Sequence, residues 1–248
     1  MLLSIRRLNS HLRLNYNSMK LSEFSAEFDI LYNNISSNIA PGLTEYEKSV
    51  FLTQAQEQLV IEIYSGQYKG EPFENSEEVR EYLKSLIQTE TLENLTEVRS
   101  EFPDTYTHYT VKLDAQNFWF VILESVIFSG EEPCTNGKRV IVQPITYDGY
   151  WSIMRNPFRG PNRNRVLRLN ISGDTVELIS DHDHEIGKYT FSFLKKPSPI
   201  ILEDIEGGTI DGSSTATDCK LPEVLHRTIL VRAVNLAKSA WGQSQEQQ

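Results

Sequence analysis

The chain has 248 residues, of which 39% are hydrophobic and 10% aromatic; this suffices for one large or two small domains and excludes global disorder. Its 34 acidic and 24 basic residues give a net charge of -10, which argues against free-standing, sequence-independent binding to duplex DNA. Its two cysteines, Cys134 and Cys219, form no CxxC pair, so we expect neither a structural zinc site nor a disulfide framework. No apolar run is long enough to cross a bilayer, so no membrane partner is expected.

The first residues, MLLSIRRLNSHLRLNYNS, contain three arginines and no acid. An organelle-targeting peptide can have this composition. However, Met19 opens a segment in which a helix begins, with Ser22 as a plausible cap. We therefore expect residues 1–18 to be a poorly ordered extension from an early start codon.

The first third of the chain has helical patterns. Apolar residues recur every three or four positions from Leu21 to Ile39, which predicts one apolar face of a helix. Thr44 and Glu47 have the spacing of a capping box, which predicts that a second helix begins there. A third helix is predicted from Glu77 to about Gln88. Together these helices predict a helical part over residues 19–90.

From Thr91 the pattern changes to short segments rich in β-branched and aromatic residues, separated by turns. Tyr189 to Leu194 alternates as a strand does, and Pro199 to Leu202 is predicted to be the last short strand. Because these segments do not alternate with helices, they favour an antiparallel sheet over βαβ units. The strand-rich part is predicted to cover residues 91–203.

The end of the chain is predicted to be a loop, a helix and a tail. Residues 204–219 are rich in Gly, Ser and Thr and are expected to form a mobile loop. Residues 221–241 form an amphipathic helix that we expect to pack back on the N-terminal helices, and residues 242–248 form a solvated tail. The predicted fold class is therefore α+β, with residues 19–241 in a single interleaved domain.

The feature that most suggests a function is a basic loop in this acidic chain. Between Arg155 and Arg168 there are five arginines and no acid, in a segment stiffened by two prolines. One interpretation is that the arginines are a solvated charge run without a function. A shaped loop that contains Phe158, however, would expose an aromatic ring unless something covers it. The arginines could bind phosphates or, with Phe158 as an anchor, the carboxylates of a protein. The acidity of the chain favours a protein, such as the acidic face of a second copy. The candidate interface residues are Arg155, Asn156, Phe158, Arg159, Arg163, Arg165 and Arg168.

One segment, Asp181-His182-Asp183-His184-Glu185, could ligate a metal. In a strand, however, its carboxylates and imidazoles would face opposite ways, and a polar hairpin turn is the favoured interpretation. The sequence contains no GxSxG elbow, no Walker loop and no recognised Cys–His signature. We therefore expect no catalytic residues, metal or cofactor, and no enzyme activity.

Three segments carry a resemblance to a known family: MKLSEFSAEFDILYNNISSNIAPGLTEYEKSVFLTQAQEQLV, QPITYDGYWSIMRNPFRGPNRNRVLRL and LPEVLHRTILVRAVNLAKSAW. In this order, over roughly Met19 to Trp241, they resemble virion structural proteins of crAss-like bacteriophages. The block NPFRGPN...RVLRL is the most specific of the three. The resemblance implies a connector or ring protein, commonly a twelve-fold oligomer, between portal and tail.

The expected function is therefore a non-enzymatic virion subunit, assembled in the bacterial cytoplasm, that binds itself, the portal and adjacent tail or ring proteins, with DNA passing through the lumen. One alternative is a DNA-contacting virion or packaging protein that uses the same basic loop. A second is a tail-side adaptor for fibres, and a third is a metal-dependent enzyme centred on His182 and His184.

Overall fold

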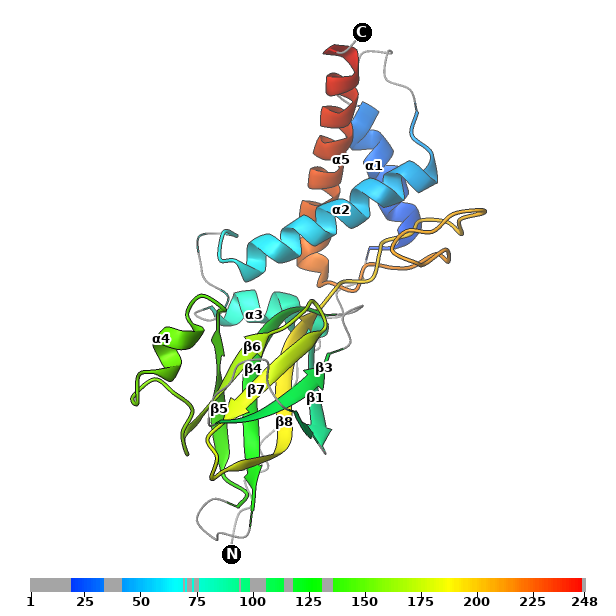
Figure 1. The fold of residues 1–248 in the computed structure, drawn as a ribbon. Coiled ribbons are helices and arrows are strands. Elements are labelled where there is room, and N and C mark those ends of the chain that lie inside the picture. Colours follow the sequence, from blue (N-terminus) through cyan, green and yellow to red (C-terminus); the bar gives the residue numbers. More distant parts are fainter. Residues whose placement is uncertain are drawn as a thin grey trace, which may run out of the picture. The chain divides into compact units, whose positions relative to one another are not determined.

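The computed structural model divides into two compact units, a helical unit of Met1–Tyr82 with Pro197–Gln248 and a strand-rich unit of Leu83–Lys196 (Figure 1). The expected extension at residues 1–18 and Cys134 lie outside the described residues. The division falls near the predicted border between the helical and strand-rich parts, and the single interleaved domain remains a prediction. No described helix is long and apolar enough to span a membrane. The structure describes residues 19–33, 42–68, 70, 73, 76–93, 95–98, 106–113, 118–130 and 136–246.

The helical unit is built from α1 (Leu21–Asn33), α2 (Glu45–Tyr64) and α5 (Glu223–Glu246), with α3 (Glu77–Leu83) at its border. Helix α5 packs against both α1 and α2, which confirms the predicted return of the last helix (Figure 1). It continues past the predicted end to Glu246. The fully buried apolar residues that join the three helices include Phe24, Phe28, Leu52, Leu59, Ile63, Leu225, Ile229 and Ala233.

The predicted capping box at the start of α2 is confirmed. The backbone N–H of Glu47 donates to Thr44 Oγ1 at 3.2 Å, and the N–H of Thr44 donates to Glu47 Oε2 at 2.8 Å. At α1 the expected cap is wrong, because the helix begins at Leu21 and places Ser22 inside its first turn. There the Glu23 carboxylate accepts a hydrogen bond from the N–H of Lys20.

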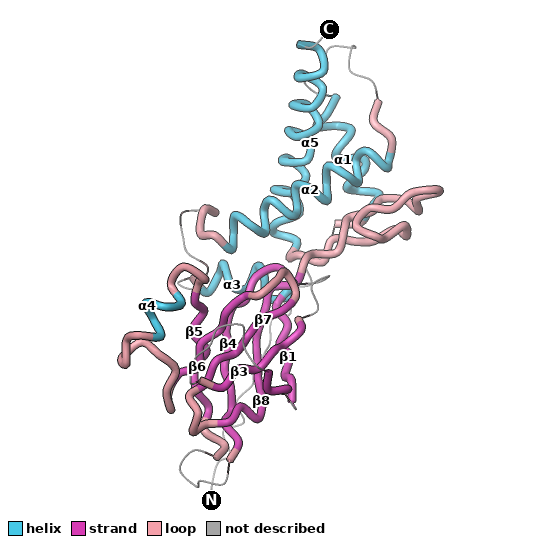
Figure 2. Tube along the Cα trace, viewed as in Figure 1, coloured by secondary structure: helices cyan, strands magenta, loops and turns pink. Residues whose placement is uncertain are grey.

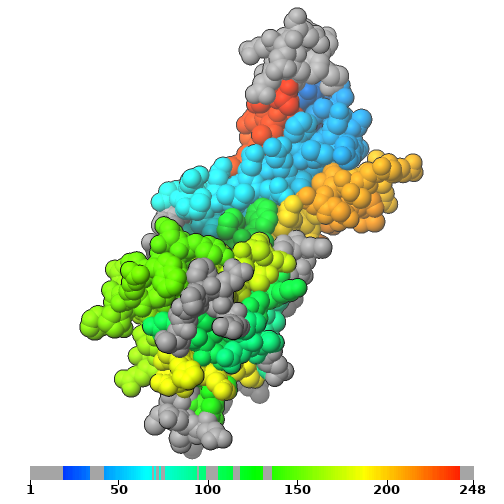
Figure 3. Space-filling view, in the orientation of Figure 1, coloured from blue at the N-terminus to red at the C-terminus, as the bar shows by residue number. Residues whose placement is uncertain are grey.

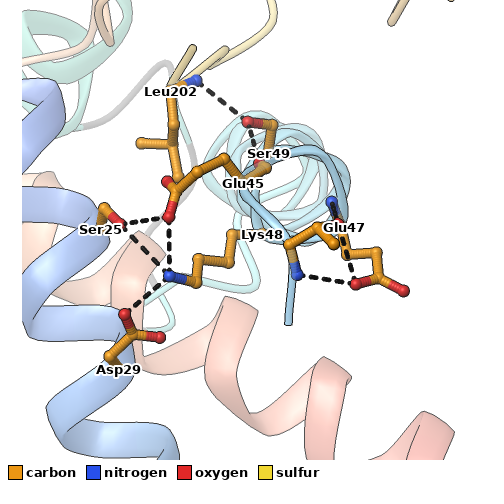
Figure 4. A network of polar contacts seen from close by, with 8 residues as sticks. Ser25, Asp29, Glu45, Glu47, Lys48, Ser49 and Leu202 are labelled. Carbon is orange, nitrogen blue, oxygen red and sulfur yellow. Dashed lines mark hydrogen bonds and ion pairs between the residues drawn. The ribbon is translucent and has the colours of Figure 1, made fainter. Parts of the chain in front are cut away.

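A buried lysine fastens α1 to α2 (Figure 4). Lys48, whose side chain is 3% exposed, places Nζ 2.7 Å from Asp29 Oδ2 and 2.9 Å from Glu45 Oε1. It also donates to Ser25 Oγ at 3.2 Å. Burial disfavours the ammonium, but hydrogen bonds and attraction from the two carboxylates outweigh it and raise the pKa of Lys48. The lysine therefore stays charged and sets the contact between the helices.

Residues 197–202 run along α2 and are not part of the sheet, which corrects the predicted strand over 199–202. Gln56, which is fully buried, donates from Nε2 to the carbonyl of Ser198 at 2.8 Å. Thr53 Oγ1 accepts from the N–H of Ile200 at 3.1 Å, and the N–H of Leu202 donates to Ser49 Oγ at 3.0 Å. These α2 side chains satisfy backbone groups that a strand would have paired, and the segment's backbone pairing is limited to an isolated antiparallel bridge between Ile201 and Thr217.

The strand-rich unit contains a curled sheet of eight strands within the described residues, in the order β1-β8-β4-β5-β6-β7-β3-β2 (Figure 2). All neighbouring pairs are antiparallel except β5 and β6, which are parallel. The curl brings non-neighbouring strands together, because the N–H of Ile186 in β8 lies 3.4 Å from the hydroxyl of Tyr109 in β3. The predicted α+β class is confirmed. The strands are β1 (Ile87–Glu93), β2 (Thr96–Val98), β3 (Thr107–Lys112), β4 (Phe118–Ser129), β5 (Arg139–Ile145), β6 (Arg165–Asn170), β7 (Thr175–Ser180) and β8 (Glu185–Lys195).

The third helix is shorter than predicted. Helix α3 ends at Leu83 and the single 3-10 turn Lys84–Leu86 follows, so Gln88 lies in β1. Ile87 pairs with Leu194 of β8, and Thr91 pairs with Thr190. Leu86 and Ile87 continued the helical spacing in the sequence, but pairing with β8 decides the conformation.

The sheet has two apolar faces. Its concave interior holds residues from β3 to β8, among them the stacked rings of Tyr189, Phe191 and Phe193. Part of the outer face is covered by a second cluster, in which helix α4 (Tyr150–Met154) places Tyr150 on Leu167 of β6. This second cluster supports the basic loop that follows α4.

Candidate protein-interaction surface

The arginine loop, residues 155–164, joins α4 to β6 and stands out at the side of the strand-rich unit (Figures 1 and 2). Its two turns are formed by asparagine side chains. Asn156 Oδ1 accepts from the N–H of Phe158 at 2.9 Å, and Asn162 Oδ1 accepts from the N–H of Asn164 at 2.9 Å. Asn156 was predicted to contact a partner, and the structure gives its carboxamide oxygen a role in shaping the loop.

Arg165 braces the loop from β6. Its Nη2 donates to the carbonyl of Phe158 at 2.7 Å and to that of Gly160 at 2.8 Å. Lys138 holds the other end, because its Nζ donates to the carbonyl of Arg163 at 3.0 Å. Hydrogen bonds from charged donors are stronger than neutral ones, so the loop is held in one conformation. Arg165, another predicted contact residue, is thus a positioning residue within its own chain.

The base of the loop is buried. Gly160 and Pro161 are enclosed, and a Cβ added at Gly160 would come within 3.3 Å of the hydroxyl of Tyr106. Tyr106 itself packs against the cluster beneath α4, together with Ile153 and Met154. The loop is therefore anchored to the fold rather than lying loose on its surface.

The tip of the loop carries exposed charges. Arg155, Arg159 and Arg163 are exposed, and none makes an ion pair with another described residue. Phe158 is 87% exposed, and Trp151 of α4 is 45% exposed. A braced loop with an uncovered aromatic ring between guanidinium groups has the composition of a protein interface, where Arg and aromatic residues are enriched.

Arg168 belongs to a different environment from the other predicted residues. It is 8% exposed in the sheet interior, and its Nε lies 2.8 Å from Glu124 Oε1 of β4. Tyr189 of β8 donates its hydroxyl to the same carboxylate, and Asn170 accepts from Nη1 of the arginine. Burial raises the pKa of Glu124, although Tyr189 and Arg168 oppose the shift, and burial beside Glu124 raises the pKa of Tyr189. We therefore leave Arg168 out of the exposed surface.

Sequence reasoning did not find Glu124, although a signal was present. It is an acid in the apolar segment from Phe118 to Phe128. An isolated acid in a buried strand needs a partner, and Arg168, which alternates with buried apolar residues in β6, has the matching charge.

Asp181 to His184 form a turn, as predicted, but the turn is not a hairpin, because β7 and β8 are not neighbours in the sheet. His184 Nδ1 lies 2.6 Å from Asp181 Oδ1, and its ring packs on Phe128. His182 is exposed. In the part of the chain that the structure describes, no group of three or more such side chains is placed to hold a metal.

A second exposed feature was not predicted as a site. Residues 203–218, which we call the acidic arm, contain five acids and no basic residue. The arm folds back on itself, because the N–H of Ile205 donates to the carbonyl of Ser214 at 2.7 Å and Asp204 Oδ1 accepts from the N–H of Ala216. In Figure 3 the arm, coloured orange, stands out beside the blue surface of the helical unit. Its Gly- and Ser-rich sequence had suggested only a mobile loop.

A cavity of about 480 Å³ lies between the acidic arm and the start of α2. Glu203 and Glu206 of the arm line it and make no hydrogen bond or ion pair through their side chains within the described residues. Glu45 also lines it, but its carboxylate is engaged by Lys48 and Ser25. Tyr46, which is 48% exposed, and Ile205 supply apolar surface. The cavity therefore combines free carboxylates with an aromatic wall.

An outward-facing set of arginines and an aromatic ring on a rigid scaffold is the kind of surface that protein assemblies use. The family model described as phage tail ring protein 3/4 matches residues 19–248. Ring protein 3 of Bacteroides phage crAss001 is 42% identical over 225 residues, which is 88% of this chain and 95% of that protein. Ring protein 4/5 of the same phage is 35% identical over 233 residues, or 90% and 94% of the two chains. The chain belongs to the phage tail ring protein 3/4 family of crAss-like phages, which confirms the resemblance read from the sequence and makes the protein a structural component of the virion.

Proposed function

We propose that this protein is a non-enzymatic ring subunit that closes into a cyclic oligomer, commonly twelve-fold, at the junction of portal and tail. It assembles in the host cytoplasm and docks the portal on one side and further tail proteins on the other. The observation that carries the proposal is the braced arginine loop. Its three exposed arginines have no partner among the residues that the structure describes, in an acidic chain that belongs to a tail ring family.

The physical argument for a contact between subunits is preorganisation. Arg165 and the two asparagines already fix the loop, so little conformational entropy is lost when it docks. The arginine tips of one copy would find abundant carboxylates on the next, because the chain carries ten more negative than positive charges. A contact between two different patches repeats head to tail and closes into a ring when its rotation allows.

Variants of the loop test this role. Replacing Arg155, Arg159 and Arg163 by alanine should prevent incorporation into the tail while leaving the monomer folded, because none of the three has a partner within the described residues. The control is Lys112→Ala with Arg139→Ala, which removes two exposed positive charges from strands of the same unit. Normal incorporation of the triple variant into virions would refute the proposed contact.

The same arginines could hold DNA phosphates, and this is the second candidate function. The observation that favours it is that the guanidinium groups are exposed and unpaired within the described residues. It predicts affinity for duplex DNA that falls steeply with salt, with a slope that decreases by about one for each arginine removed. Absence of DNA binding at low salt would leave the ring contact as the role of the loop.

A further inference from the structure

The acidic arm and the arginine loop are complementary in charge, and each carries an exposed aromatic ring beside it. The loop tip presents the consecutive residues Phe158 and Arg159, both of which are exposed. The cavity at the arm presents free carboxylates beside the exposed ring of Tyr46. An aromatic anchor with an adjacent guanidinium matches an aromatic wall with adjacent carboxylates, because both halves of such a contact become buried together.

The mouth of the cavity is open to a side chain. Gly207 and Gly208 line it without placing a side chain in it, and Gly207 has a φ of +79°, which favours glycine. No lysine or arginine is among the described residues that line the cavity. The carboxylates of Glu203 and Glu206 therefore have no cationic partner among the described residues. The arginine loop of another copy could supply one.

We propose that the tip of the arginine loop of one copy docks in the cavity at the acidic arm of the next copy. Phe158 lies against Tyr46 and Ile205, and the guanidinium groups of Arg159 and Arg163 pair with the carboxylates of Glu203 and Glu206. This inference rests on the proposed function and names the surface that receives the loop. Because donor and acceptor are different patches, each copy uses one of each, as a closed ring requires.

Two charge-reversed proteins test the proposal. The first carries Arg159→Glu and Arg163→Glu, so both its loop and its arm are acidic. The second carries Glu203→Arg and Glu206→Arg, so arginines stand at the proposed contact positions of both its loop and its arm. Each alone should associate about 100-fold or more weakly than the unmodified chain, because the contact positions of the loop and the arm now carry like charges.

The decisive measurement is the mass of an equimolar mixture of the two proteins. In the mixture the glutamates of one loop meet the arginines placed at positions 203 and 206, and the arginines of the other loop meet Glu203 and Glu206, so alternating copies should regain the oligomer that neither forms alone. Only a contact between different molecules can give this rescue. Mass photometry over a dilution series measures both the loss and the recovery.

The remaining outcomes separate this inference from the proposed function. If the loop-reversed protein is monomeric but the arm-reversed protein still assembles, the loop is a contact whose receiving surface is not the arm, and the inference fails alone. If both assemble normally, both proposals fail. If neither assembles and the mixture does not recover, the pairing of these charges is refuted.

Two further variants keep the test independent of folding. If the arm-reversed protein unfolds, the variant with Glu203→Gln and Glu206→Gln replaces it, because glutamine keeps the shape of the side chains. This variant should still weaken association. Unchanged association would overturn the proposal. Glu97→Arg with Glu185→Arg makes the same change of net charge on exposed strand residues outside the cavity. This control should assemble as the unmodified chain does.

Discussion

Replacing Glu124 and replacing Arg168, the two members of a buried ion pair, should destabilise the fold by different amounts. In Glu124→Gln the hydroxyl of Tyr189 keeps an acceptor, but Arg168 remains charged in the sheet interior without a carboxylate. In Arg168→Met the remaining Glu124 can take up a proton and become neutral. Since arginine cannot lose its charge in this way, Glu124→Gln should be the more damaging change.

The magnitude follows from burial of the pair, with side chains 5% and 10% exposed. Loss of one partner of such a pair costs about 3–5 kcal/mol of unfolding free energy, and we expect that full cost for Glu124→Gln. Burial raises the pKa of Glu124 above 4.5, and losing Arg168 raises it further because Arg168 opposes the shift. A folded-state pKa above the unfolded value gives stability that is present at low pH and lost as pH rises through the folded pKa. Arg168→Met should therefore recover stability as pH falls from 7 toward 5, and Glu124→Gln should not.

Urea unfolding followed by tryptophan fluorescence measures this difference. Trp119 and Trp151, two of the three tryptophans, lie in the strand-rich unit and report its unfolding. Curves recorded from pH 5 to pH 8 should converge for Arg168→Met and the unmodified chain at the acidic end. If the two variants lost the same unfolding free energy at every pH, this would refute the argument that the buried charge of Arg168 needs Glu124 more than Glu124 needs Arg168.

Three further predictions follow from other contacts. Arg165→Met should speed amide hydrogen exchange across the arginine loop and weaken assembly, although the exposed arginines are kept; unchanged exchange would contradict its bracing role. Burial raises the pKa of Cys219 to about 12, so in a Cys134→Ser background it should react with a thiol reagent at pH 8 about 1,000-fold more slowly than a free cysteine until urea is added. Thr44→Ala should cost about 1 kcal/mol by removing the capping box of α2, measured by circular dichroism during urea unfolding, with Thr96→Ala on an exposed strand as control.

Features decided by neighbours in sequence were predictable. The capping box depends on Thr44 and Glu47, three residues apart, and was found as expected. The asparagine turns of the arginine loop span two residues each and are equally local, although Asn156 was predicted to contact a partner and not to shape the loop. Such local hydrogen bonds need no knowledge of the rest of the fold.

Features decided by distant partners were not predictable. Residues 199–202 looked like a strand because they are apolar, but Thr53, 147 residues away from Ile200 in sequence, supplies the hydrogen bond that a neighbouring strand would have made. Arg168 looked like its four neighbouring arginines until the curl of the sheet placed it against Glu124, 44 residues earlier. In both places tertiary contacts override the local pattern.

The central claim is that the exposed tips of the arginine loop hold ring subunits together, and the most direct test is the mass of the assembled protein. Native mass spectrometry of the unmodified chain should show one closed oligomer, and the variant with Arg155, Arg159 and Arg163 replaced by alanine should be a folded monomer at the same concentration. An unmodified chain that stays monomeric at high concentration, or a triple variant that forms the same oligomer, would contradict the claim.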